Sequence, residues 1–305
     1  MKKILLATTI LVGTAGFAAA EVTLSGSSVF GLGYWEAIEE GNDTFSVMET
    51  YLTATATVQS DAGLEFGFEQ TFGTYSTEDA RAGDGISNDG TSVYVSGAFG
   101  KLSFGSVEEA NDFADLPDIG GLNGLGVDDV AELYSDTGDN GDLFPGLGYN
   151  RSSDINYTGT FGAFTIGLST NLNGPGDDTD DSSSIGLNYN FGDGYVGLGY
   201  VNTENFGEAM SLYAGGTFSG VTVNAMYTEF DPELDIDKQS AYGIYAAYTT
   251  GALTLSAEVA DADAFEDTSY GFGASYDLGG GAAVVGGIGS VAGTTRAEAG
   301  VSFEF

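Results

Sequence analysis

The chain has 305 residues, 45 of them acidic and 7 basic, a formal net charge of −38 at pH 7, and neither cysteine nor histidine. This composition excludes disulfides, zinc sites built from histidine or thiolate, and nucleophilic sites of the Ser-His or Cys-His type. The negative charge also excludes nucleic acid as a natural partner and makes cations the expected one.

Residues 1–20 have the pattern of a cleaved signal peptide. Two lysines precede a mostly apolar stretch, and Ala18-Ala19-Ala20 forms an A-x-A cleavage signal. The apolar stretch is too short, and too often interrupted by polar residues, for a membrane anchor. We therefore expect residues 21–305 to form the mature protein, one large β domain.

Segments of about ten residues with period-two alternation follow along the rest of the chain. Leu64, Phe66 and Phe68, for example, alternate with Glu65 and Glu69. Sixteen such segments are predicted as strands: 21–35, 44–60, 64–75, 91–98, 102–106, 149–158, 164–171, 183–191, 195–203, 209–218, 221–230, 239–249, 252–261, 268–278, 282–290 and 295–305.

Short glycine-rich turns alternate with long acidic loops between these segments. All 4 prolines fall in the long loops, as expected where strands must donate every backbone N–H. Short turns at one rim and long loops at the other are typical of a transmembrane β-barrel with short periplasmic turns. The fold class predicted is therefore all-β, a 16-stranded antiparallel transmembrane β-barrel.

A soluble sandwich would give the same alternation with its apolar face turned inward. Aromatic residues beside the short turns favour the barrel, because such residues form girdles at membrane interfaces. These aromatics are Phe99, Phe104, Phe161, Phe164, Phe191, Tyr195, Phe218, Tyr248 and Tyr276.

Four stretches resemble the general porins of Gram-negative bacteria, in particular the alphaproteobacterial type related to Rhodobacter porins. They are 61–67 (DAGLEFG), 96–101 (SGAFGK), 196–200 (VGLGY) and 271–281 (GFGASYDLGGG). The resemblance implies a homotrimer in the cell outer membrane, in contact with lipid and lipopolysaccharide. Each barrel would be a passive diffusion channel for small hydrophilic solutes. The terminal Phe305 is similar to the family's assembly signal.

The 42-residue segment 107–148 lies where such porins place a third extracellular loop that folds into the lumen as a constriction. A connection this long needs a functional reason, although a solvated flap is the alternative. The acids expected at the pore constriction are Glu108, Glu109, Asp112, Asp115, Asp118, Asp128, Asp129 and Glu132.

Side-chain parity assigns further charged residues to the lumen wall: Glu49, Glu65, Glu69, Glu258 and Arg296. Porins of this kind usually oppose the acidic loop with an arginine cluster near the second to fourth strands. This chain has Met48-Glu49-Thr50-Tyr51 there, without arginine. Acids without a basic wall concentrate cations, so we predict a cation-selective pore.

Asp136, Asp139 and Asp142 could form a calcium site, because closely spaced carboxylates supply hard oxygen ligands. Solvated acids are the alternative, and the segment does not match a complete EF-hand loop. No cofactor is otherwise required.

Two other functions remain open from the sequence. One is an outer-membrane barrel with a closed lumen that acts as an adhesin or structural anchor. The other is a secreted calcium-binding β protein, which the missing glycine-aspartate repeats disfavour. An enzyme is not expected, because the residues of the common hydrolytic sites are absent.

Overall fold

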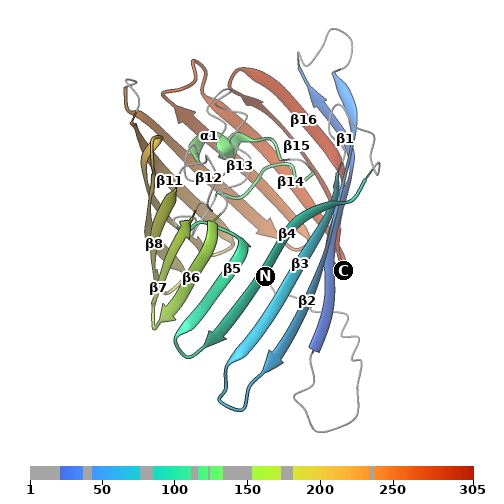
Figure 1. Ribbon diagram of the computed structural model, residues 1–305. Coiled ribbons are helices and arrows are strands. Elements are labelled where there is room, and N and C mark those ends of the chain that lie inside the picture. The colour runs from blue at the N-terminus through green and yellow to red at the C-terminus, as the bar shows by residue number, and fades with distance from the viewer. Residues whose placement is uncertain are drawn as a thin grey trace.

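The computed structural model describes residues 21–36, 43–75, 85–110, 116–122, 124–132, 153–172, 181–233 and 237–305. Within these ranges, sixteen antiparallel strands close into one barrel (Figure 1). The strands are β1 Glu21–Trp35, β2 Thr44–Gln59, β3 Glu65–Tyr75, β4 Ser87–Gly97, β5 Gly100–Val107, β6 Ser153–Phe161, β7 Phe164–Asn171, β8 Ser182–Phe191, β9 Gly194–Thr203, β10 Gly207–Phe218, β11 Val221–Pro232, β12 Gln239–Thr250, β13 Leu253–Ala262, β14 Ser269–Gly279, β15 Ala282–Val291 and β16 Thr294–Glu304.

One short helix, α1 (Val127–Ala131), accompanies these strands in the described residues. No helix in that part of the chain is long and apolar enough to cross a bilayer.

The first and last strands close the barrel by pairing with each other, while every other neighbour pair is consecutive in sequence. At the end of this seam, Gly26 and Phe305 exchange backbone hydrogen bonds of 2.8 and 2.9 Å. A Cβ at position 26 would lie 2.6 Å from the Phe305 ring, so the close approach requires glycine. The C-terminal aromatic residue is thus part of the seam.

Many large apolar side chains of the strands face outward and are exposed. In β14, Tyr270, Phe272 and Tyr276 are 51%, 61% and 52% exposed. The intervening Gly271 and Gly273 are buried on the inner face. A soluble sandwich would bury the aromatic side instead, so the pattern is that of a barrel whose outer wall faces lipid.

The short turns are mostly two-residue hairpins flanked by aromatics. Of the nine aromatics expected in a girdle, eight are at least 42% exposed. Tyr195 is the exception, because its position in β9 turns it inward, where its hydroxyl donates to Asn224 Oδ1 at 3.1 Å.

Two strands, β4 and β6, differ most from the sequence prediction, and most of the others differ at their ends by one or two residues. β6 continues through Phe161, which pairs with Phe164 across a turn where Gly162 has φ 66°. The strand predicted at 149–158 was therefore ended three residues too early. β4 begins at Ser87 because a bulge beside Thr71 lets it keep pairing with β3. The signal-peptide region 1–20 lies outside the described residues.

Candidate pore constriction

The connection between β5 and β6 carries α1 inside the barrel. The helix packs mainly against β13, and also against β12, β14, β15 and β11 (Figure 1). It begins after Gly126, whose φ of 66° lies in the left-handed region that glycine adopts readily. The described part of segment 107–148 is therefore folded onto the inner wall.

Apolar packing holds this segment in place. Ile119, Val127 and Val130 are each fully buried, at 0% exposure. They belong to a cluster that includes the inward-facing Ala260 of β13. Gly243 of β12 makes room for the segment, because a Cβ there would lie 2.4 Å from the Cβ of Ala131. Small residues on the wall thus leave the space in which the loop packs.

Hydrogen bonds to the wall anchor the loop backbone at two places. The Leu122 N–H donates to Glu298 Oε1 at 2.9 Å, and Glu298 is only 7% exposed. The Ala110 N–H donates to Ser169 Oγ at 3.0 Å and to Ser184 Oγ at 2.7 Å. None of these three anchors, Glu298, Ser169 and Ser184, was predicted from the sequence. Parity along β16 was the available signal for Glu298, which lies two residues from Arg296 on the same face.

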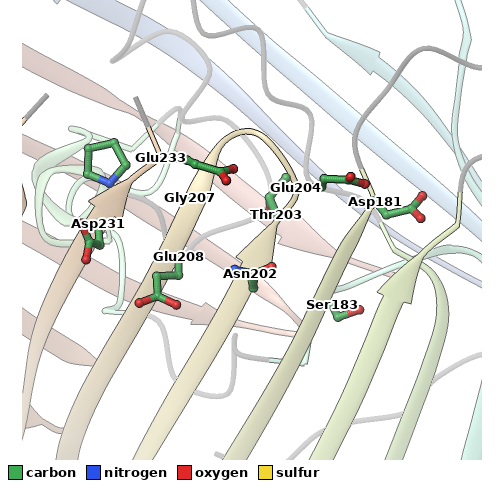
Figure 2. A pocket seen from close by; sticks show the side chains of 10 residues that line it. Asp181, Ser183, Asn202, Thr203, Glu204, Gly207, Glu208, Asp231 and Glu233 are labelled. Carbon is green, nitrogen blue, oxygen red and sulfur yellow. The ribbon is translucent and has the colours of Figure 1, made fainter. Parts of the chain in front are cut away.

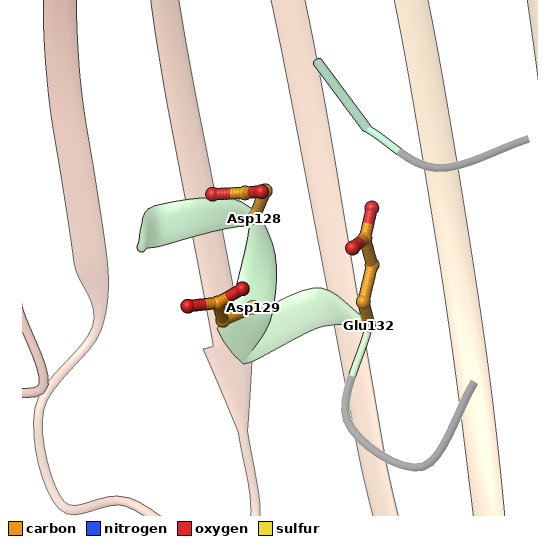
Figure 3. Close-up of side chains that lie close together, drawn as sticks. All are labelled: Asp128, Asp129 and Glu132. Carbon is orange, nitrogen blue, oxygen red and sulfur yellow. The ribbon is translucent and has the colours of Figure 1, made fainter. Parts of the chain in front are cut away.

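Acids gather on the loop side of β13. Asp128 and Glu132 are 5% and 2% exposed, and Glu258 of the wall is 4% exposed. The side chains of Asp128 and Asp129 on α1, and of Glu132 directly after it, lie close together (Figure 3). Glu132 also accepts the Leu116 N–H through Oε1, which ties the two ends of the described loop together.

Burial raises the pKa of Asp128 well above its ordinary value. A hydrogen bond with Asp118 raises the pKa further, as do the charges of Asp118, Asp129 and Glu132. The docked loop therefore favours the uncharged form of this carboxyl group.

Arg296 is the basic residue at this site. Its guanidinium carbon lies 4.5 Å from the centre of the Trp35 ring, and Nη1 donates to the Leu125 carbonyl at 3.5 Å. Asp129 is its electrostatic partner. The guanidinium is thus bound to the loop on the same wall and does not stand across the lumen from it.

The predicted constriction acids fall into three groups. Glu108 and Asp118 are exposed, and Asp129 is partly exposed. Glu109, Asp128 and Glu132 are at most 5% exposed, so they pack between loop and wall and do not line an open pore. Asp112 and Asp115 lie outside the described residues, as do the three predicted calcium ligands Asp136, Asp139 and Asp142.

The predicted lumen-wall acids fall into two groups, those that face the lumen and one that the loop covers. Glu65 and Glu69 alternate with the exposed Phe66 and Phe68, so they face inward on β3. Glu49 shares the face of Val47, which contacts the loop residue Leu122. Glu258, by contrast, is covered by the loop and has no access to the open lumen, because α1 lies over β13.

One basic residue faces inward on the opposite wall. The ammonium group of Lys101 lies 4.3 Å from the centre of the Tyr94 ring, whose hydroxyl donates to Glu65 Oε1 at 3.1 Å. Arg81 and Arg151 lie outside the described residues.

A separate pocket of about 630 Å³ lies at the rim of the long loops, between β8 and β11 (Figure 2). Ser183, Asn202 and Glu208 of its lining alternate in phase with exposed apolar residues of their strands, so the pocket opens on the outer wall. Five acids line it: Asp181, Glu204, Glu208, Asp231 and Glu233. None of its lining residues belongs to segment 107–148.

Comparison with known proteins agrees with this architecture. The pattern of a family described as Gram-negative porin matches residues 7–296. The porin of Rhodobacter capsulatus is 32% identical over 303 residues, covering 88% of this chain and 93% of that protein. Two mutant structures of Rhodopseudomonas blastica porin each superpose with a TM-score of 0.75 at 21% identity, covering 93% of this chain and 100% of theirs. At 21% identity, the structural similarity shows the fold alone.

Proposed function

The chain belongs to the Gram-negative porin family and forms a diffusion channel in the outer membrane, and from that premise we propose that the channel prefers cations. Transport through it is passive: we propose that the chain needs no cofactor and catalyses no reaction. The sequence has 0 His and 0 Cys, which excludes Ser-His and Cys-His nucleophilic sites and zinc sites built from histidine or thiolate.

The distribution of charge around the docked loop carries the cation proposal. Glu65 and Glu69 face the lumen from β3, and Asp118 is exposed on the loop. The described basic residues nearby, Arg296 and Lys101, keep their positive charge but are fewer than these acids. Unbalanced negative charge in a narrow passage attracts cations and repels anions.

Reversal potentials in planar bilayers under a KCl gradient test the proposal. We expect a potential whose sign corresponds to potassium crossing faster than chloride, and a smaller potential at high salt because charges are screened. A permeability ratio near one, or a preference for chloride, contradicts it. The same recording addresses the closed-barrel alternative, an adhesin or anchor, because a closed lumen would give no conductance steps.

We also propose a homotrimer that contacts lipopolysaccharide. Ala54 and Ala56 lie on the outward face of β2, and small side chains there suit close protein contact. The acid-lined pocket in Figure 2 supports cation-bridged contact with lipopolysaccharide phosphates. Crosslinking in mild detergent should give trimers, and chelation should lower the amount of co-purified lipopolysaccharide. Monomers alone, or lipopolysaccharide insensitive to chelation, would count against these two points respectively.

A further inference from the structure

An aromatic ring on the inner wall opposite the loop carries an ammonium group above it. The Nζ atom of Lys101 in β5 lies 4.3 Å from the centre of the Tyr94 ring in β4. Tyr94 pairs with Gly67 of β3, and a Cβ at position 67 would lie 2.2 Å from the ring. The ring therefore fills the space that a side chain on residue 67 would need, and it lies along the wall.

Carboxyl groups lie beside this ring on the same face of the sheet. The Tyr94 hydroxyl donates to Glu65 Oε1 at 3.1 Å, and Glu69 acts on the hydroxyl electrostatically. Glu65, Glu69 and Tyr94 are each partly exposed, so the group is in contact with the lumen. An aromatic face next to acids is a surface that binds alkylammonium ions, because the ring quadrupole and the carboxylates both attract positive charge.

Lys101 shows that an ammonium group is accepted at this place. Its side chain is exposed, and it forms no ion pair with any carboxyl group in the described part of the chain. An exposed lysine could extend into the water of the lumen, but this one places its ammonium group over the ring. Cation–π contacts at exposed sites are weak, so a second cation can replace the lysine there.

We propose that the face of the Tyr94 ring beside Glu65 and Glu69 is a binding subsite for the alkylammonium groups of solutes. Lys101 fills this subsite when no such solute is bound, and it acts as a tethered competitor. Its effective concentration at the ring is on the order of millimolar, as for other short flexible tethers. Quaternary ammonium ions suit the site best, because aromatic faces are the usual recognition surface for such ions.

The place of the subsite in the fold separates it from the constriction. Lys101 is the second residue of β5, close to the short turn from β4, and no residue of the subsite belongs to segment 107–148. An alkylammonium ion that crosses the lumen would be held there briefly, which should slow its passage relative to potassium. Such a site goes beyond a general preference for cations, because it distinguishes ions of the same charge by their contact with an aromatic ring.

Single-channel recording in planar bilayers with the full-length barrel tests the subsite. Potassium current is measured while tetramethylammonium chloride is added, in the Lys101→Met background, which removes the competitor. Tyr94→Leu in this background should raise the half-blocking concentration about two- to fivefold, as expected for an exposed cation–π contact, whereas Tyr94→Phe should preserve it. Tyr195→Leu is the matched control, because Tyr195 also faces inward and its ring contacts Tyr213. Block unchanged by Tyr94→Leu, or changed equally by Tyr195→Leu, overturns the proposal.

A comparison with Tyr94 intact keeps the test valid if the leucine variant folds poorly. Lys101→Met alone should lower the half-blocking concentration at least about threefold relative to the wild type, because the tethered competitor is gone. Lys238→Met also removes one positive charge, from an exposed lysine that pairs with Glu229 and Asp231 at the rim, and should have no such effect. Equal effects of the two variants would show that net charge, and not the ring, governs the block, and the subsite would be refuted.

Ion selectivity of the same channels is a separate readout. The ratio of potassium to chloride permeability tests the proposed cation preference, whereas block is compared between variants of equal charge. A channel that prefers chloride but whose tetramethylammonium block depends on Tyr94 would contradict the preference and support the subsite. A cation-selective channel whose block is independent of Tyr94 would do the reverse.

Discussion

Glutamates have different roles on the wall beneath the constriction loop and on the wall formed by β2–β4. Glu258 and Glu298 on the first are 4% and 7% exposed and contact or face the loop. Glu49, Glu65 and Glu69 on the second face the lumen and are partly exposed. A carboxylate covered by the loop contributes to loop docking, whereas one in contact with water contributes to the field that solutes cross.

The largest effect in this comparison is expected from the apolar seat of the loop. Ile119→Ala should weaken docking by about 2–5 kcal/mol, because the side chain is fully buried and a cavity would remain. Single-channel conductance should rise and become noisier as the loop leaves the wall. Ile288→Ala is the matched control, since Ile288 is 56% exposed on the outer face. Equal effects of the two variants would show that the loop is not held by this contact.

The next effect concerns a polar anchor on the same wall. Glu298→Ala leaves the Leu122 N–H buried without its acceptor, which should cost about 1–3 kcal/mol of docking free energy. Glu298→Gln keeps an acceptor oxygen and should restore most of the loss. Protease cleavage within 107–148 measures docking directly. A glutamine variant as sensitive as the alanine variant would mean that the charge, and not the hydrogen bond, is what matters.

The two walls also differ in how much of their structure could be predicted from the sequence. All sixteen strands were predicted because period-two alternation and glycine turns are local signals. Parity places Glu65 and Glu69 on the inner face, because they alternate with the exposed Phe66 and Phe68. The burial of Glu258 was not predictable, because it depends on where α1 lies, and segment 107–148 has no periodicity that fixes its path. The contact between Arg296 and Trp35 likewise depends on closure of β1 against β16.

Docking of the loop onto its wall should also depend on pH. The pKa of Asp128 is raised in the docked loop, mainly by burial, so docking favours its protonated form. In calcium-free protein, the contribution of this group to docking is full below the pKa of the released carboxyl, near 3.8, and falls as pH rises toward the raised pKa. Asp128→Asn should flatten this dependence. Proteolysis of the loop across that pH range in EDTA provides the measurement, and a wild-type loop that became more protected with rising pH would contradict the sign.

The smallest effect should come from the exposed acids of the opposite wall. Glu65→Gln and Glu69→Gln should each lower the ratio of potassium to chloride permeability without loosening the loop. Charges in water interact by only about 1 kcal/mol at 4 Å, so each variant should change the ratio by less than about fivefold. The change should shrink further at high salt. Asp61→Asn, at the exposed turn between β2 and β3, is a control for a lost charge outside the passage. If Asp61→Asn lowered the ratio as much as Glu65→Gln, selectivity would follow the overall charge of the barrel, and the lumen-facing position of β3 acids would have no special role.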